Sequence, residues 1–363
     1  MNSTASSRVR ELITGLTSSH RELLTLRREI VAVLRRAVPF DGWCWGYTDP
    51  ETRLFSSGDG DNPASASDLG RYFVLEFARD EQDCQVSFAE LADGVRPAVS
   101  VLSDATGGDL HRNARWRELY GPHGVGDELR LALLADGQCW GYLELLREDT
   151  GRYFSLEEAE FLLRLGAPIA KAIRETLTRV EAPTTDLRRG PGTLVFDGND
   201  VLAASTPEGD EWLATLRFAG TPAAAALPIP VPVVGLVGWL RSAGSPAPGL
   251  ATGRVRTRTA DGHWLVMHAS PLTGMSVPVG SVAVTVQSAR AGDVAGLIFR
   301  AHGLTARERQ LAGLLLDGLS NTEIARGLDI SAYTVQDHVK AVLGKLGVHS
   351  KRELIAGVLG QRL

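Results

Sequence analysis

Cysteine is scarce in this sequence, and its spacing excludes the two kinds of site that cysteine pairs usually form. Only Cys44, Cys84 and Cys139 occur among 363 residues, and no two of them form a Cys-x-x-Cys pair. An odd number without such a pair supports neither a disulfide framework nor a thiolate zinc site. Histidines in the metal spacing HExxH are also missing. We therefore expect reduced thiols and no metal, haem or other cofactor.

Long apolar runs and enzyme signatures are missing too. No stretch approaches eighteen uninterrupted apolar residues, and the opening MNSTASSRVREL lacks the basic, apolar and small-residue order of a secretory signal. We therefore expect a cytoplasmic protein. The sequence contains neither GxxxxGK(S/T) nor GxSxG, and it lacks the clustered acidic pattern of a phosphorylatable receiver domain. We accordingly expect no enzymatic activity, and control by ligand, redox state or partner rather than by phosphorylation.

Charge is distributed unevenly along the chain. The net charge of -5 would count against a nucleic-acid partner, because binding to phosphates needs Lys and Arg. From Arg300 to the end, however, nine Lys or Arg stand against six Asp or Glu, so the rest of the chain carries -8. We call residues 300–363 the head. A mildly basic head on an acidic body is typical of a DNA-binding module attached to a regulatory region.

The first 180 residues predict helices and strands, two of which form a hairpin. Apolar residues at helical spacing predict helices, and short alternating or aromatic stretches between turn residues predict strands. Asp136-Gly137 is a strong signal for a hairpin. The predicted elements are a loose leader over 1–19, a helix over 21–37, a strand over 43–47, hairpin strands over 129–134 and 138–146, and a long helix after Ser155.

Two stretches in this order of elements resemble the GAF sensor domain. They are Gly141-Tyr142-Leu143-Glu144-Leu145 and Phe154-Ser155-Leu156-Glu157. The resemblance covers about residues 20–180. It implies an antiparallel sheet with helices packed on it, and terminal helices that often pair two protomers.

The middle of the chain predicts a second sheet. Residues 181–192 have the Pro, Gly, Thr and charge of a linker, and 221–232 are Ala/Pro-rich, which predicts an irregular loop. By its order of elements, the segment 193–292 resembles a PAS domain. The predicted strands are 193–196 paired with 201–205, 254–259 paired with 263–269 across Asp261-Gly262, and 281–287.

The head carries repeated helix-start signals. Thr305 with Glu308, Ser320 with Glu323, and Ser350 with Glu353 each fit the capping box, in which the hydroxyl and the carboxylate satisfy each other's backbone amides. Gly318 and Gly347 stand where the first and third helices should end. The predicted helices are 305–317, 321–328, 332–346 and 351–359.

The third helix of the head has one apolar and one polar face. Only three residues separate it from the second helix, which predicts the tight turn of a helix-turn-helix. Gln, Lys and Asp side chains can pair with adenine, guanine and the cytosine amino group. The residues expected to pack inward are Val335, Val339, Leu343 and Leu346, and those expected to face outward are Thr334, Gln336, Asp337, Lys340, Ala341 and Gly344.

The start of this helix departs from the other starts. Behind the cap residue Ser331 stands Thr334 in place of a capping Glu. A carboxylate at that position would repel a phosphate, whereas free amides at the positive end of a helix attract one. The start of the third helix thus lacks an acidic residue at the position where a DNA phosphate would contact it.

These features together resemble the LuxR-type (LuxR/FixJ) DNA-binding domain over residues 303–359. The matching stretches are Leu304-Thr305-Ala306-Arg307-Glu308, Ser320-Asn321-Thr322-Glu323-Ile324-Ala325, Ser331, Thr334-Val335, His338-Val339 and Lys345-Leu346-Gly347-Val348. The resemblance implies that Gln336, Asp337 and Lys340 face bases, with the other candidates near the DNA backbone. The candidate DNA-binding residues are Thr322, Ser331, Thr334, Val335, Gln336, Asp337, His338, Lys340, Lys345 and Lys351.

Three features of the body have two interpretations each. Trp43, Trp45 and Trp140 could line a ligand pocket or simply fill the core. Cys44 and Cys139 occur in similar Gly-x-Cys-Trp-Gly-Tyr contexts and could form a redox pair on neighbouring strands or act as small buried apolar residues. The apolar stripe over 161–177 fits a dimer helix or a helix that covers the sheet.

The sequence thus predicts an α+β multidomain protein, with a GAF-like antiparallel sheet domain, a PAS-like β-rich domain and an all-α, four-helix helix-turn-helix domain. The leading hypothesis is a one-component transcription regulator, a homodimer on duplex DNA with an unknown effector and RNA polymerase as further partners. In the alternative the body is a protein-interaction scaffold. An enzymatic body would need a polar cluster, and the sequence shows none. A sigma-factor region is disfavoured by the Lys345-Leu346-Gly347-Val348 continuation and by the long body.

Overall fold

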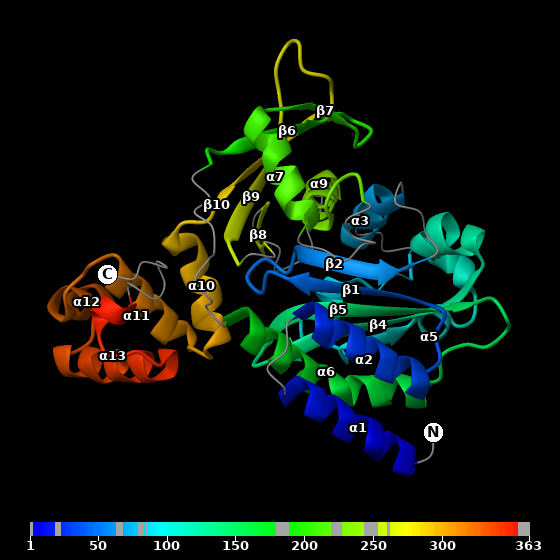
Figure 1. Cartoon of the computed structure of the whole chain (residues 1–363), viewed down its shortest axis with the longest axis horizontal. Helices are drawn as coiled ribbons and strands as arrows, with labels where there is room; N and C mark the ends of the chain where they lie inside the picture. The colour runs from blue at the N-terminus through cyan, green and yellow to red at the C-terminus, as the bar shows by residue number, and fades with distance from the viewer. Residues whose placement is uncertain are drawn as a thin grey trace.

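Two five-stranded antiparallel sheets and a C-terminal group of helices make up the described part of the chain (Figure 1). The computed structural model describes residues 3–18, 23–62, 68–78, 83–84, 86–178, 189–218, 227–242, 253–259 and 262–354. This arrangement confirms the expected α+β, multidomain fold class. Within these ranges, no helix has both the length and the apolar character needed to cross a membrane.

The N-terminal sheet has the strand order β2-β1-β5-β4-β3. Its central hairpin turns at Asp136 and Gly137, both with positive φ (50° and 70°), as the Asp-Gly signal predicts. Helices α2 and α6 cover one face, and α1 packs on both of them (Figure 1). The strands are β1 (Gly42–Thr48), β2 (Phe55–Asp61), β3 (Val99–Val101), β4 (Val125–Ala135) and β5 (Gln138–Glu148), and the helices are α1 (Ser3–Ser18), α2 (Leu23–Ala37) and α6 (Leu156–Thr178).

The loose leader expected over residues 1–19 is wrong, because α1 is a helix that packs against α2 and α6. Ile13 has no exposed surface, and Val9 and Leu16 pack beside it. These three residues recur at spacings of four and three, which places them on one helical face. The many Ser, Thr and Arg residues between them conceal that stripe in the sequence.

The opposite face of the N-terminal sheet carries shorter helices. Phe73 and Phe77 of α3 pack there with Phe88, and their rings contact Phe55 of β2 or one another. The helical segments on this side of the chain are α3 (Leu69–Phe77), α4 (Phe88–Leu91), α5 (Leu102–Ala105), η2 (Leu110–Arg112), η3 (Trp116–Tyr120) and η4 (Gly121–His123).

The middle sheet has the strand order β7-β6-β10-β9-β8. The expected pairings of 193–196 with 201–205 and of 254–259 with 263–269 are confirmed, although Asp261 of the second turn lies outside the described residues. The strands are β6 (Gly192–Phe196), β7 (Leu202–Ser205), β8 (Arg254–Arg258), β9 (Trp264–Pro271) and β10 (Val282–Ser288).

Two helices of the middle domain were not predicted. They are α7 (Pro207–Phe218) and α9 (Val231–Ser242). The irregular loop expected over 221–232 is wrong at its end, where α9 begins, and 221–226 lie outside the described residues. Most of the linker expected over 181–192 also lies outside the described residues. Its last residue, Gly192, begins β6. Helix α9 is buried almost all round, so it lacks the polar face that makes helical periodicity visible in a sequence.

The two sheets share one apolar core. Helix α9 lies between the middle sheet and α3 of the N-terminal domain (Figure 1). Phe55 and Phe73 from the N-terminal domain belong to the same buried cluster as Val233, Leu236 and Trp212 from the middle domain. The two sheet domains therefore form one body rather than two units on a flexible link.

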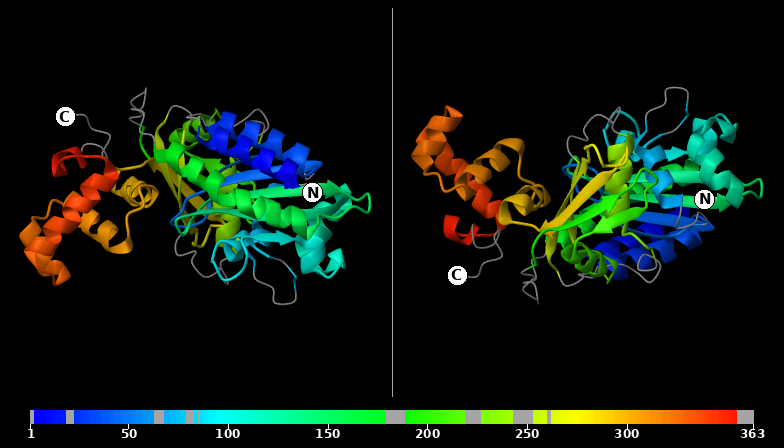
Figure 2. Two further views of the ribbon diagram at one scale, coloured as in Figure 1. Left: turned by 90° about the horizontal axis from the view of Figure 1, so that it is seen from below. Right: turned by 90° about the horizontal axis from the view of Figure 1, so that it is seen from above.

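Helix α10 (Ala291–Ala301) connects this body to the head, which lies at one end of the molecule in every view (Figure 2). It packs on α6 of the body and on α11 of the head. The helices of the head are α11 (Ala306–Leu316), α12 (Asn321–Leu328) and α13 (Ala332–Leu346). The predicted fourth helix is helical from Lys351 to Leu354, and the rest of it lies outside the described residues.

Two glycines of α9 test the contact between the sheet domains. A Cβ at Gly238 would lie 2.6 Å from the Cβ of Phe73, whereas one at Gly235 would meet the ring of Phe73 at an ordinary 3.4 Å. Gly238→Ala should therefore lower the free energy of unfolding by about 1–3 kcal/mol through overpacking. Gly235→Ala should leave it unchanged or raise it by up to about 1 kcal/mol, because Ala is the better helix former. Urea denaturation of the two variants measures the difference, and equal stabilities would contradict this account of the interface.

Candidate nucleic-acid interface

Capping boxes fix the first helices of the head as predicted. The Thr305 hydroxyl accepts from the Glu308 amide at 3.3 Å, and the Glu308 carboxylate accepts from the Thr305 amide at 2.6 Å. Ser320 and Glu323 repeat the same pair of bonds. The third predicted box is only half formed, because Glu353 accepts from the amide of His349 instead of the cap residue. Helix starts are thus set by local chemistry in this domain.

The turn between α12 and α13 has the expected tight geometry. Asp329 adopts a left-handed conformation (φ 52°), and its amide donates to the carbonyl of Ala325. The amide of Ile330 donates to that same carbonyl at 3.1 Å. At the end of α13, Gly347 is left-handed as well (φ 68°), as predicted for a C-terminal cap. The helix-turn-helix is therefore built from residues close in sequence.

The outer face of α13 is open to solvent. Gln336, Asp337 and Lys340 are exposed, as are Ala341 and Gly344. On the inner face Val335 and Val342 are fully buried, and Val339, Leu343 and Leu346 pack against the same core. The predicted division into an apolar and a polar face is confirmed, with Val342 as an additional core residue.

The N-terminus of α13 has free capacity for an anion. The Ser331 hydroxyl accepts from the Thr334 amide at 3.0 Å, and the two side-chain hydroxyls lie 2.8 Å apart. The first turn contains no acidic residue, unlike the first turns of α11 and α12. The backbone amides of a helix's first turn and the positive end of its dipole favour a phosphate at such a point.

Three members of the candidate DNA-binding set have contacts within the head. Val335 has no exposed surface, so its assignment as a DNA contact is wrong and its place is in the core. Lys345 binds the Glu308 carboxylate at 2.7 Å and so ties α13 to α11. Lys351 donates to the carbonyl of Leu319 at 2.7 Å. Of the remaining candidates, Thr322 and Ser331 are exposed, and Thr334 and His338 are half-buried.

Tyr333 belongs to this surface and was missed. Its side chain is 74% exposed in the first turn of α13. It stands four residues before Asp337 and seven before Lys340, so the three share one helical face. That spacing is visible in the sequence, but an aromatic residue falls outside the polar pattern that identifies the other candidates.

The ion pair between Glu308 and Lys345 affects the pKa of the glutamate. Partial burial acts to raise the pKa of Glu308, but the hydrogen bonds from Lys345 and from the Thr305 amide outweigh it. They hold the pKa of this carboxyl below its usual value. Glu308 is therefore charged at neutral pH, and it neutralises a lysine that would otherwise be free to contact DNA.

A cluster of charged side chains lies buried in the N-terminal domain. Arg115 binds Glu128 at 2.7 Å and Glu76 at 3.5 Å, Arg130 also binds Glu76, and Arg130 lies 3.8 Å from Glu144. All five side chains are at most 3% exposed. The expectation that the body lacks a polar cluster is therefore wrong. Its members come from α3, β4, β5 and the start of η3, far apart in sequence, so no local motif announces them.

One carboxyl of this cluster is favoured in its neutral form. Burial and the neighbouring Glu128 raise the pKa of Glu144 well above its usual value. Burial acts on Glu128 too, but Arg115 outweighs it and lowers that pKa to about 2. Tyr120 and Tyr72 donate to the two oxygens of Glu144 at 2.9 and 3.3 Å. With Glu144 protonated, two arginines balance two carboxylates.

The tryptophans proposed for a pocket lie in the core. Trp45 and Trp140 are at most 1% exposed among the helices that cover the N-terminal sheet, and Trp43 packs against the same cluster. This placement favours the packing interpretation over a ligand role.

The two cysteines lie on neighbouring strands but out of reach of each other. Cys44 of β1 is paired with Glu144 of β5, whereas the carbonyl of Cys139 accepts from Thr48, four residues further along β1. Four residues of a strand span about 13 Å, and a disulfide needs Cα atoms within about 7 Å. A redox pair between them is excluded in this fold.

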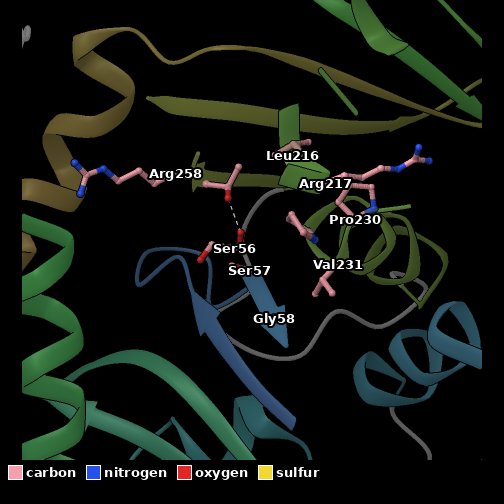
Figure 3. Close-up of a pocket in the computed structure, with 10 residues that line it drawn as sticks. Ser56, Ser57, Gly58, Leu216, Arg217, Pro230, Val231 and Arg258 are labelled. Atoms are coloured by element: carbon pink, nitrogen blue, oxygen red, sulfur yellow. Dashed lines mark hydrogen bonds between the residues drawn. The ribbon is translucent and has the colours of Figure 1, made fainter. Parts of the chain in front are cut away.

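A small cavity lies at the seam between the two sheets (Figure 3). It holds about 30 Å³, enough for one or two waters and too little for an organic effector. The hydroxyl of Thr257 closes one side by donating to the carbonyl of Ser56 at 2.6 Å. Among the described residues, no three His, Cys, Asp or Glu side chains are close enough to hold a metal ion.

Comparison with known families agrees with this geometry. Residues 302–358 match the model described as "Bacterial regulatory proteins, luxR family", and residues 16–173 match the GAF domain. The chain therefore carries a GAF domain in its N-terminal part and a luxR-family helix-turn-helix domain in its C-terminal part.

The curated relatives match only a short segment of this chain. The regulator MalT of Yersinia pestis is 40% identical over 58 residues, which are 16% of this chain and 6% of MalT. The monoamine regulon transcriptional regulator of Klebsiella aerogenes is 43% identical over 53 residues, 15% of this chain and 23% of that protein. The matched segment thus spans less than a quarter of either relative.

Two solved structures are similar at low scores. Escherichia coli SdiA covers 93% of this chain and 90% of its own, with 12% identity and a TM-score of 0.29. A Vibrio cholera VqmA-ligand-DNA complex covers 48% and 86%, with 21% identity and a TM-score of 0.22.

The charge states in the buried cluster predict opposite effects for two matched substitutions. Glu144→Gln should raise the free energy of unfolding at neutral pH, because Gln resembles the protonated carboxyl of the folded state and does not gain a charge in the unfolded chain. Glu128→Gln should lower it by about 3–5 kcal/mol, because Arg115 loses the closer of its two buried counter-ions. Chemical denaturation at pH 7 distinguishes them, and an equal loss in both would show that Glu144 is charged.

The same cluster predicts a dependence on pH. The pKa of Glu128 is lowered, so its contribution to stability is present above its unfolded value of 4.5 and is lost as the pH falls toward about 2. The pKa of Glu144 is raised, so its contribution is present below 4.5 and is lost as the pH rises through the raised value. Glu144→Gln should therefore remove the alkaline decline and leave the acid decline in place.

Proposed function

We propose that this protein is a one-component, sequence-specific transcription regulator whose helix α13 enters the major groove of DNA. The observation that carries the proposal is the open polar face of α13 on a luxR-family domain. Gln336 is suited to adenine, Lys340 to guanine, and Asp337 to the amino group of cytosine.

Other groups on and around α13 fit the DNA backbone and fix the register of this helix in the groove. The amides behind Ser331 receive a phosphate, and Thr322, Thr334 and His338 flank the groove wall. Tyr333 offers a hydroxyl to a phosphate and an aromatic edge to a thymine methyl group. Lys345 and Lys351 support the domain from within, through the bonds described above.

The body is proposed to control the head, and two modes remain in competition. In the first, the GAF region binds an effector. In the second, the body is a scaffold for a protein partner, which is supported by the sheet face filled with ion pairs and with α9. A compound that raises the melting temperature of the purified protein in proportion to RT ln(1 + [L]/Kd) would favour the first.

A homodimer is proposed through the first two helices. A groove of about 600 Å³ runs between α1 and α2, and Leu12 in it is 50% exposed. Arg8 and Glu11 on its rim carry opposite charges on one helix, which suits pairing with a second copy about a two-fold axis. Two linked heads bind two half-sites more tightly than either head binds one.

Two substitutions test the recognition face. Duplexes selected by the full chain from a random-sequence pool supply the binding site, and gel shifts then measure affinity. Gln336→Ala and Lys340→Ala should each weaken binding by about 5- to 150-fold, the effect of losing one bidentate base contact. Lys340→Ala should also reduce the dependence of affinity on salt if the lysine contacts a phosphate as well.

Lys171→Ala is the matched control, because this exposed lysine lies on α6 of the body. It should bind the selected DNA as the unaltered protein does. Full retention of affinity by both recognition-face variants would refute the proposed role of α13.

A further pair tests the dimer. Leu12→Asp places a charge in the groove between α1 and α2 and should convert the dimer to a monomer in sedimentation velocity. Leu156→Asp, at a comparably exposed leucine at the start of α6, should leave the dimer intact. A dimer unaffected by Leu12→Asp would exclude this groove as the interface.

A further inference from the structure

One buried arginine touches three parts of the molecule. Arg256 lies on β8 of the middle sheet and is 1% exposed. Its Nε and Nη2 donate to the carboxylate of Asp49 at 2.7 and 2.5 Å, and its Nη2 lies 2.7 Å from Glu51. Both acids belong to the turn between β1 and β2 of the N-terminal sheet. The side chain therefore joins the two sheet domains by a bidentate ion pair.

The remaining nitrogen of Arg256 reaches the helix that leads to the head. Nη1 donates to the carbonyl of Asp293, in the first turn of α10, at 2.8 Å. Arg254 donates to the same carbonyl at 3.3 Å. The Asp293 carboxylate in turn accepts from the amide of Arg290 and so caps the helix. The start of α10 is held in place by the middle sheet.

The far end of α10 is held by the N-terminal domain. Arg300 donates to the side chain of Gln138, at the turn of the β4–β5 hairpin, at 3.2 Å. Ala301 belongs to the apolar cluster beneath the N-terminal sheet. Ala295 and Phe299 belong instead to the core of the head. One helix of eleven residues thus takes part in the packing of both body and head.

We propose that Arg256 is the relay through which both sheet domains set the position of the DNA-binding head. A shift of the β1–β2 turn or of β8 moves the guanidinium, and the guanidinium holds the first turn of α10. Since α10 is part of the core of the head, its displacement reorients α11 to α13 as one unit. The bidentate geometry fixes direction as well as distance, which a lysine at this position would not do.

A purely structural ion pair would have a different consequence. Removing such a pair would loosen the two sheets that it joins. The amides of α10 would then lose no more protection from exchange than the amides of those sheets. The relay requires that α10 loosens selectively while the two sheets and the three head helices keep their protection, because each has a core of its own.

Hydrogen–deuterium exchange of the full chain without DNA tests this relay. The double substitution Asp49→Asn with Arg256→Met removes both charges, so that no buried ion is left without its partner. Amides of residues 294–301 should exchange at least tenfold faster than in the unaltered protein. Amides of β4, β5, β9 and β10 should exchange at unchanged rates. Since no DNA is present, the outcome is independent of the proposed recognition face.

Arg241→Met is the matched control. Arg241 of α9 pairs with Asp200 and donates to the carbonyl of Gly280, both within the middle domain. It should leave the exchange of α10 unchanged. Unchanged α10 rates in the folded double variant, or equal acceleration in the control, would overturn the proposal. If the double variant does not fold, Arg254→Ala carries the test, because this partly exposed side chain donates to the same carbonyl. Its α10 amides should exchange at least threefold faster, and a rate equal to that of the unaltered protein overturns the relay.

Discussion

The rest of the structure depends on the apolar contact between α9 of the middle domain and α3 and β2 of the N-terminal domain. This contact keeps bulk water out of the seam, where the pair between Asp49 and Arg256 is buried in a medium that makes it both strong and specific. A buried pair of this kind contributes little to stability by itself, because desolvation offsets most of the attraction. Its effect is to fix the geometry that the surrounding apolar packing makes possible.

Features encoded by neighbouring residues could be predicted from the sequence. The β4–β5 hairpin follows from Asp136-Gly137, whose left-handed conformations suit a two-residue turn, and the head helices follow from their caps. The features that could not be predicted depend on residues distant in the chain. Helix α9 is surrounded by apolar partners and shows no periodicity, and α1 hides a three-residue stripe among polar residues. Arg256 and Asp49 are 207 residues apart, so nothing local connects them.

The candidate site shows the same division. The outward face of α13 could be predicted because helical spacing alone decides which side chains share a face. Whether a lysine on the head is available to DNA depends on its partner, and Lys345 has one on α11. In the same way, the five charged residues around Arg115 become a cluster only when α3, η3 and two strands meet. A polar cluster carried by one helix or strand is visible in the sequence. A cluster whose members come from several helices and strands is not.

Two residues of α10 that are only two positions apart pack into different cores. Phe299 belongs to the core of the head, and Ala301 belongs to the core of the body. A helix is a screw, and each residue added to it turns everything beyond by about 100° and advances it by about 1.5 Å. A single insertion between these two residues would swing α13 by more than a quarter of a turn without altering any surface of the head. The number of residues in this helix therefore sets an angular phase between body and head, and natural variation in its length would change the spacing of the paired DNA sites more readily than their sequence.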